Sequence, residues 1–254
     1  ETRAATPYPS GVTIRGAATP TQKQQLQTYL ENGGNLFVTT DLTVDTPNLD
    51  ALLAEYGMTR QEGLVIENDS NYYAYRYPQT YLLPSLSSND ITAGITDGMY
   101  VFTPVSQGIV KGASTDDLTL TPLLSTSSTA YSMQDYAEAT TAEQGANDPN
   151  GPFNIAVAAS NSATGAKVVW VNCPNMLNSQ MNSAVSGGNA QLLGSIVNWF
   201  DGEQTTAVIS GKSLSAASLT VPNNMIIVLG LLFTIVLPLA FIVAGIAITL
   251  VRRR

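Results

Sequence analysis

The side chains that could do chemistry in this chain are acids, a single thiol and a group of tyrosines. The 254 residues include 19 Asp and Glu, 11 Lys and Arg, one cysteine (Cys173) and no histidine. Without histidine the chain cannot form a Ser-His-Asp or Cys-His nucleophile system, and one thiol argues against a zinc site. Carboxylate chemistry, as in a glycosidase with two facing acids, is the enzymatic route left open. We expect a protein that is not an enzyme and that holds neither a cofactor nor a metal.

The charge and the glycine pattern argue against further classes of function. The formal net charge is −8 at pH 7, and an acidic domain repels nucleic acid, so we expect no nucleic-acid partner. The sequence contains neither a Gly-x-Gly-x-x-Gly run nor a phosphate loop, which leaves a nucleotide site unsupported. The acidic surface also has a simpler interpretation, because it keeps a domain soluble.

One candidate binding residue is an acid at the end of a predicted strand. Asp41 directly follows the apolar residues 35–40, and open α/β sheets bind ligands at the carboxyl ends of their strands. Asn172 and Cys173 end a later predicted strand in the same way. Residues of these types also form turns, so a turn-forming role for Asp41 stays open beside the binding role.

The other candidate is a tyrosine-rich segment. Tyr72, Tyr73, Tyr75 and Tyr77 are our candidate ligand-binding residues there, and Tyr81 lies close to them in the sequence. Tyrosine combines an apolar ring with a polar tip, so the segment could stack on sugars or peptides. The alternative is a partly buried flap that covers the sheet.

Helix signals precede both regions. Thr19 and Gln22 can form a capping box around Pro20, which suits the first helical position, and Gly33 can end that helix. Thr and Pro occur in the same order before a second apolar periodic run that starts at Pro47. We therefore predict two helices in this part of the chain.

Apolar runs between turn signals predict the strands. They cover residues 35–40, 63–67, 154–159 and 167–171, and a short joint with glycine predicts a hairpin between the last two. Asn189 can cap a final helix whose apolar face packs on the sheet. Helices and strands that alternate at short spacing predict an α/β fold with a mostly parallel sheet flanked by helices.

The end of the chain is unlike the rest. Residues 225–251 carry no charged side chain, and Arg252, Arg253 and Arg254 follow them. A helix over this run would be roughly 40 Å long, enough for a ~30 Å hydrocarbon core, and terminal arginines act as a cytoplasmic stop. We predict one C-terminal transmembrane helix in the cell membrane, with the bulk of the chain extracytoplasmic. The predicted organisation is an α/β domain at residues 1–200, a stalk or edge segment at 201–223 and the transmembrane helix at 224–254.

Three residues of the predicted anchor could help it dock. Pro238 removes a backbone hydrogen bond and can bend a helix, and Gly230 and Gly245 would allow close approach of a neighbouring helix. We expect the anchor to pack against a partner bundle. The alternative is a bent anchor that only tethers the domain.

The order of these segments resembles gliding-motility-type ABC-transporter auxiliary proteins. YLENGGNLFVTTD at residues 29–41 is similar to the family's L-x-x-Y-L-x-x-G-G-x-L-x-V-x-x-D stretch. The resemblance continues in order through LLAEYGMTRQEGLVIE, TPLLSTS, GPFNIAVAAS, AKVVWVNCPNMLN, GGNAQLLGSIVNWF and LPLAFIVAGIAITLVRRR. The given sequence does not include the family's first anchor or the front part of its outer domain, and we expect these either in a longer precursor or missing from a short variant.

The resemblance implies both a fold and a role. The fold would be an α/β outer domain like a class I amidotransferase sheet without its catalytic residues. The role would be an auxiliary or substrate-engaging subunit of a bacterial ABC transport system, docked on a polytopic permease in the lipid bilayer beside a cytoplasmic ATPase. The alternative is a membrane-anchored surface module that binds glycan or peptide through the tyrosine-rich segment.

Overall fold

The structure is a computed structural model that describes residues 17–74, 78–96 and 98–202, and in the C-terminal stretch residues 231–239, 241, 248 and 252. The chain divides into two units, Glu1–Ile209 and Ser210–Arg254. The tyrosines Tyr75 and Tyr77 of the predicted binding segment lie outside the described residues.

The first unit contains four α-helices, one short 3-10 helix and eleven short strands among its described residues. The helices are α1 (Pro20–Glu31), α2 (Pro47–Glu55), η1 (Pro174–Leu177), α3 (Ser179–Ala184) and α4 (Gly188–Asp201). The strands are β1 (Asn35–Thr39), β2 (Met58–Arg60), β3 (Leu64–Ile66), β4 (Tyr81–Leu82), β5 (Ser85–Leu86), β6 (Thr103–Pro104), β7 (Ile109–Lys111), β8 (Leu118–Ser125), β9 (Tyr131–Met133), β10 (Asn154–Asn161) and β11 (Lys167–Val171).

The main sheet is mixed, and the prediction of a mostly parallel sheet is wrong. Its strand order is β1-β11-β10-β7-β2, with β8 also paired to β10 and β5 paired to β8. Only β1 and β11 run parallel among its described strands, and the other pairs are antiparallel. Two small antiparallel sheets, β3-β9 and β4-β6, lie beside it. The predicted strand at residues 63–67 therefore exists as β3 but does not join the main sheet.

For β10 and β11, the reason for the antiparallel pairing is the length of their connection. A turn of a few residues joins β10 to β11, which forces the two strands to run in opposite directions. Asn161 shapes this turn, because its side-chain oxygen accepts hydrogen bonds from the backbone N–H groups of Ala163 (3.0 Å) and Thr164 (3.1 Å). The predicted hairpin is thus confirmed. The helix connections that a parallel sheet needs are few in this chain.

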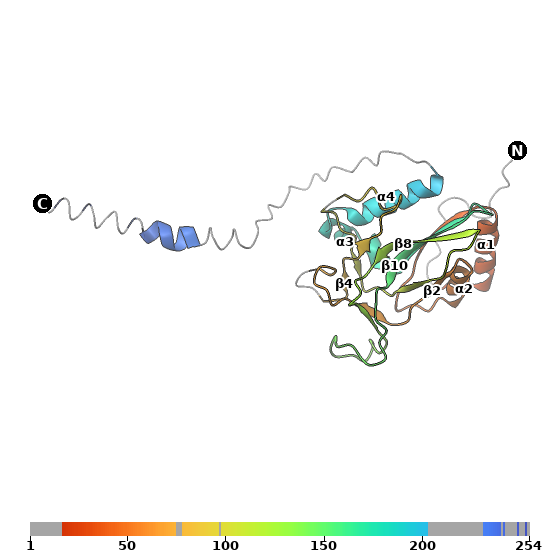
Figure 1. The fold of residues 1–254 in the computed structure, drawn as a ribbon, viewed down its shortest axis with the longest axis horizontal. Coiled ribbons are helices and arrows are strands. Elements are labelled where there is room, and N and C mark those ends of the chain that lie inside the picture. The colour runs from red at the N-terminus through yellow and green to blue at the C-terminus, as the bar shows by residue number, and fades with distance from the viewer. Residues whose placement is uncertain are drawn as a thin grey trace. The chain divides into compact units, whose positions relative to one another are not determined.

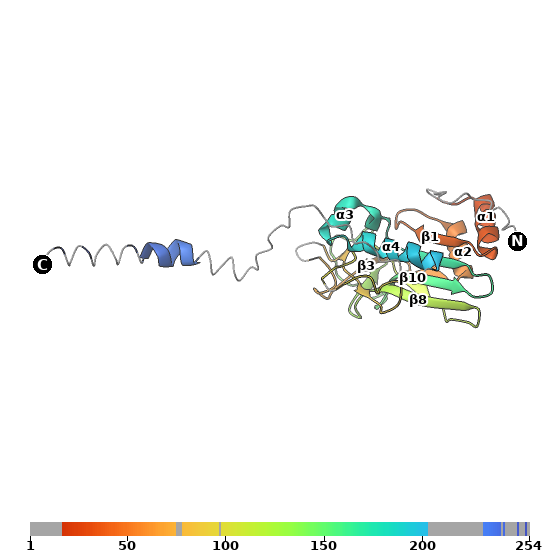
Figure 2. The ribbon, with the colours of Figure 1, turned by 90° about the horizontal axis from the view of Figure 1, so that it is seen from above.

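Helices cover both faces of the sheet, and the alternation of strand side chains divides the core accordingly (Figures 1 and 2). Val168 and Trp170 of β11 pack with α1 and α2, whereas Val169 and Val171 pack with α4. Trp170 is fully buried. The core of the first unit is therefore two apolar layers that share one sheet.

The predicted start of α1 is confirmed in detail. The backbone N–H of Gln22 donates to Oγ1 of Thr19 (3.2 Å), and the Thr19 N–H donates to Oε1 of Gln22 (2.9 Å). Thr46 does not cap α2 in this way. Its hydroxyl instead accepts a hydrogen bond from the Arg60 guanidinium (2.7 Å), which also pairs with Asp50 (2.8 Å).

The prediction of a C-terminal membrane span requires correction. Among the residues described, no helix has the length and apolar character needed to cross a membrane. The described helical residues of this stretch include 231–239, within which lies the π-helix η2 (Leu232–Val236). The structure therefore supports neither the predicted transmembrane helix nor the location in the cell membrane.

Most residues named for the anchor are outside the described part of the chain. These are Gly230, Gly245, Arg253 and Arg254. Pro238 and Arg252 are described, and both are helical and exposed. The docking role of the anchor residues stays a prediction.

Both ends of α4 are attached to the rest of the first unit, and its C-terminal end rests on charged and polar side chains. The Lys167 ammonium donates to the backbone carbonyls of Trp199 and Phe200 and lies 5.0 Å from the centre of the Trp199 ring. Nδ2 of Asn35 donates to the same Phe200 carbonyl (3.1 Å). A cation at a helix C-terminus is favourable because the last carbonyls carry partial negative charge.

We expect Lys167→Met to lower the free energy of unfolding by about 1–2 kcal/mol, because the last carbonyls of α4 lose their cation. Urea unfolding followed by circular dichroism measures the change. The control is Lys111→Met, since the Lys111 ammonium contacts only its neighbour's carbonyl, at Gly112. Equal losses in the two variants would contradict the capping role.

Candidate functional site

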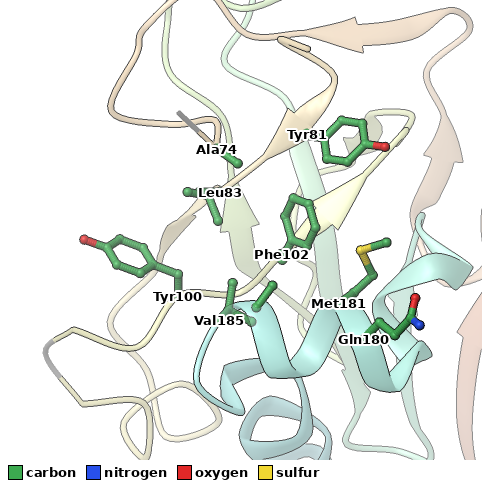
Figure 3. Close-up of a pocket in the computed structure, with 9 residues that line it drawn as sticks. Ala74, Tyr81, Leu83, Tyr100, Phe102, Gln180, Met181 and Val185 are labelled. Carbon is green, nitrogen blue, oxygen red and sulfur yellow. The ribbon is translucent and has the colours of Figure 1, made fainter. Parts of the chain in front are cut away.

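A pocket of about 580 Å³ opens between a hairpin, residues 99–102 and α3 (Figure 3). The hairpin pairs residues 72–74 with residues 81–83, which include β4, and is called the β4 hairpin below. This volume lies within the ~300–1,000 Å³ typical of ligand pockets. The apolar residues that line it are Ala74, Leu83, Phe102, Met181, Ala184 and Val185. The residues in its lining that carry a polar side-chain group are Tyr81, Tyr100 and Gln180. In Figures 1 and 2, α3 lies at the end of the first unit opposite α1.

The first wall is a hairpin built from the tyrosine-rich segment. The Ala74 N–H donates to the Tyr81 carbonyl (2.9 Å), and the Leu83 N–H donates to the Tyr72 carbonyl (2.7 Å). Because side chains alternate along an extended strand, Tyr81 and Leu83 face the pocket while Leu82 between them is buried in the core.

The second wall is continuous with the first through two aromatic rings. Those of Tyr81 and Phe102 have centroids 5.6 Å apart and planes tilted by 41°. This arrangement is one that aromatic pairs prefer. Tyr100 completes the wall and is 54% exposed, so a ligand could contact it without rearrangement.

The buried side-chain amide of Asn189 positions this second wall. It also positions the segment that leads into the third wall, α3. The Asn189 Oδ1 accepts a hydrogen bond from the Phe102 N–H (2.8 Å), and its Nδ2 donates to the carbonyls of Phe102 (3.0 Å) and Met176 (2.9 Å). Met176 lies in η1, which leads directly into α3. Asn189 therefore links α4 to two segments that line or support the pocket.

Two glycines bring α4 close enough for these bonds. Gly187 is the N-cap of α4 with φ at 90°, a conformation that side-chain-bearing residues rarely adopt. A Cβ on Gly188 would lie 2.0 Å from the carbonyl oxygen of Tyr100, so only glycine fits there. The predicted cap at Asn189 is therefore wrong by position: the helix begins earlier, and the Asn189 side chain bonds to distant backbone.

Asp41 lies where it was predicted, at the carboxyl end of β1, but it does not line the pocket. Its carboxylate accepts hydrogen bonds from the N–H and hydroxyl of Thr43 (both 2.8 Å), which is a local turn. Beside it, the Thr40 hydroxyl donates to Oδ1 of Asn172 (2.7 Å) and accepts from Nε1 of Trp170 (2.8 Å). The carboxyl ends of β1 and β11 do meet, but their polar groups satisfy one another.

The predicted tyrosines are only partly brought to the site. Tyr72 and Tyr73 are half-buried on the outer arm of the hairpin, where Tyr73 pairs with Leu82. Neither lines the pocket, although their segment forms its wall. Sequence reasoning missed Tyr100 and the α3 residues. The spacing of Met181 and Val185, one helical turn apart, was the available signal for an apolar stripe.

The thiol of Cys173 is not available for chemistry. Burial raises the pKa of Cys173 to about 11, although hydrogen bonds with Ser106 and nearby backbone groups oppose the shift. Its Sγ lies 3.1 Å from the Pro104 carbonyl, to which the thiol donates. The side chain is therefore a protonated, fully buried packing group. In the described ranges no cluster of three acid or thiol side chains could hold a metal ion.

Comparison with known proteins places the fold and nothing more. No protein-family model matches the sequence, and neither does any curated protein. The solved structure of the "mmIFT52 N-terminal domain" has a TM-score of 0.54 and 18% identity, covering 76% of each chain. A "Cytoplasmic Protein STM3548 from Salmonella typhimurium" has a TM-score of 0.37 and 12% identity, covering 72% of this chain and 61% of that one. The first is a likeness of fold alone, and the second is too distant to support an argument.

We expect Asn189→Asp to lower the free energy of unfolding by about 2–4 kcal/mol, because the carboxylate keeps the acceptor but loses both donors to buried carbonyls. Chemical unfolding measures the loss. Asn198→Asp on the same helix is the control, and it should lower stability by no more than about 1 kcal/mol, the cost of a carboxylate in the last turn of a helix. If the two variants unfold alike, the Asn189 bonds are not what holds the pocket walls.

We also expect Cys173 to resist alkylation in the folded protein. At pH 8 a thiol of pKa 9 is about one-tenth thiolate, whereas one of pKa about 11 is about one-thousandth. Iodoacetamide labelling followed by mass spectrometry should therefore be at least ~100-fold slower than in urea, and should accelerate as the pH rises toward 11. Equal rates in the folded and unfolded chain would refute the buried, protonated state.

Proposed function

We propose that this chain is a non-enzymatic auxiliary subunit that works by contact, and that the pocket between the β4 hairpin and α3 receives part of its partner. The observation that supports this most directly is the make-up of the pocket. Its lining consists of aromatic and aliphatic side chains, two of them tyrosines, together with the single amide residue Gln180. Such a surface gains free energy by removing apolar groups from water and has few groups that could move a proton.

The assembly to which the subunit belongs is suggested by the sequence. The segments that resemble gliding-motility-type ABC-transporter auxiliary proteins include the Gly187-Gly188-Asn189 run that supports the pocket. We therefore propose a polytopic permease and its cytoplasmic ATPase as the partners. ATP would be hydrolysed by the ATPase, because this sequence has no phosphate loop.

A glycan- or peptide-binding module is the second candidate. The support for it is that Tyr81 of the tyrosine-rich segment and Tyr100 both line the pocket. A glycan needs several hydrogen-bonding groups in addition to stacking, and this lining offers few. A glycosidase has less support, because the described lining contains no carboxylate, whereas that chemistry uses two.

We expect Ala184→Trp to reduce co-purification of the permease and the ATPase at least tenfold, because an indole at this exposed position of α3 would occupy the pocket. The measurement is quantitative recovery of both subunits with the tagged full chain. Val197→Trp is the control, since Val197 is 56% exposed on α4 and does not line the pocket.

Circular dichroism establishes that both variants fold. Recovery equal to the wild type in Ala184→Trp would place the contact elsewhere on the chain. Failure of the wild-type chain to recover either subunit would contradict the ABC assembly itself.

A further inference from the structure

The basic side chains that the structure describes in the first unit are already engaged with other groups. In the described part of the first unit the basic residues are Lys23, Arg60, Lys111 and Lys167. Lys23 pairs with Glu55 (3.2 Å), and Arg60 pairs with Asp50 at 2.8 Å. Lys111 and Lys167 bind backbone carbonyls.

The acidic residues are far more numerous, and most have no cation beside them. The whole chain has 19 acids against 11 bases, and the described acids include exposed ones such as Glu62, Asp90 and Glu138. None of the described residues that line the pocket is basic. A segment that approaches the pocket therefore meets apolar walls on a chain of strongly negative net charge, which attracts a cationic partner and repels an acidic one.

The pocket itself favours large apolar side chains. Met181 is flexible and polarizable, and it adapts to partners of different shape. The Tyr81–Phe102 pair provides a fixed aromatic wall opposite α3 (Figure 3). Ala184 and Ala74 leave room where larger residues would close the opening. Together these features suit one or two bulky side chains such as Leu, Met or Phe.

We infer that the occupant is a polypeptide segment of the partner in which large apolar side chains are flanked by lysine or arginine. This inference rests on the proposed function, which it makes more specific by giving the chemistry of the contact. The apolar side chains enter the pocket, and the flanking cations remain in the negative field around it. The apolar contact holds the complex together, while the charges direct the approach and discriminate against acidic segments.

Three fluorescent peptides of equal length test the inference on the full chain. The first has Leu and Phe flanked by lysines, the second has serine in place of the apolar residues, and the third has glutamate in place of the lysines. Fluorescence anisotropy gives each Kd at about 50 and about 300 mM NaCl, where the Debye length falls from roughly 14 to 6 Å. We expect the first peptide to bind at least tenfold more tightly than either of the others, and more weakly at high salt.

A matched pair of variants tests both parts of the inference at one position. Ala184→Lys and Ala184→Glu add chains of similar length at the exposed rim of the pocket, with opposite charge. We expect Ala184→Lys to weaken binding of the lysine peptide at least fivefold relative to Ala184→Glu, and Ala184→Trp to abolish it. Because Ala184 is an exposed helix residue, these variants should fold as the wild type does.

Each other result overturns the inference. Binding of the lysine peptide that is unaffected by Ala184→Trp would mean charge attraction alone. Equal binding of the glutamate peptide, or equal effects of Ala184→Lys and Ala184→Glu, would contradict the requirement for lysine or arginine beside the apolar side chains. No binding of the lysine peptide would contradict the inference that an apolar segment with cationic flanks occupies the pocket. The proposed function fails separately, if permease and ATPase recovery does not depend on the pocket.

Discussion

The Asn189 side chain has to satisfy three backbone groups at once, and the arrangement of the binding end depends on it. It accepts from the Phe102 N–H and donates to the carbonyls of Phe102 and Met176, all in a fully buried position. The primary amide of Asn supplies an acceptor oxygen and two donor hydrogens on one short side chain, which matches the one N–H and two carbonyls that face it. Each of these groups would cost about 1–3 kcal/mol if it were buried without a partner. The pocket walls therefore keep their spacing because the alternative leaves polar backbone unpaired.

The two glycines before Asn189 allow α4 to come close enough for these hydrogen bonds. Gly188 allows α4 to approach the Tyr100 carbonyl to a distance at which any Cβ would collide. Gly187 turns the chain into the helix through a left-handed conformation. The three residues Gly187, Gly188 and Asn189 therefore act together. Gly187 turns the chain, Gly188 permits α4 to approach the Tyr100 backbone, and Asn189 supplies the hydrogen bonds. Phe102, which Asn189 positions, forms the aromatic wall of the pocket together with Tyr81.

Features that depend on near neighbours in the sequence could be predicted, and features that depend on distant partners could not. The Thr19–Gln22 capping box and the hairpin between β10 and β11 involve residues a few positions apart, and both were predicted correctly. Whether strands run parallel depends on pairing across the whole chain, which local apolar runs do not encode.

The site shows the same division. Asn189 was recognised as a helix-start residue, but the partners of its amide are far away in the sequence and could not be inferred. The pocket combines a hairpin, a loop and a short helix from three separate segments. Asp41 had the expected position at a strand end, yet its Oδ1 already accepts two hydrogen bonds from Thr43. The uncharged C-terminal run satisfied a length criterion, but no helix among the described residues has the length and apolar character to cross a membrane.

The attachments of α4 at its two ends also have a mechanical consequence. One attachment is at Asn189, beside the pocket, and the other is at the Trp199 and Phe200 carbonyls, beside Lys167 at the start of β11, so the two are separated by roughly 16 Å at ~1.5 Å per residue. The chain leaves the helix after Asp201, at the end remote from the pocket. A pulling force applied to the following segment would load the contacts of Lys167 and Asn35 with the last carbonyls first. Those contacts would break first, before the tension reaches the Asn189 amide that shapes the pocket.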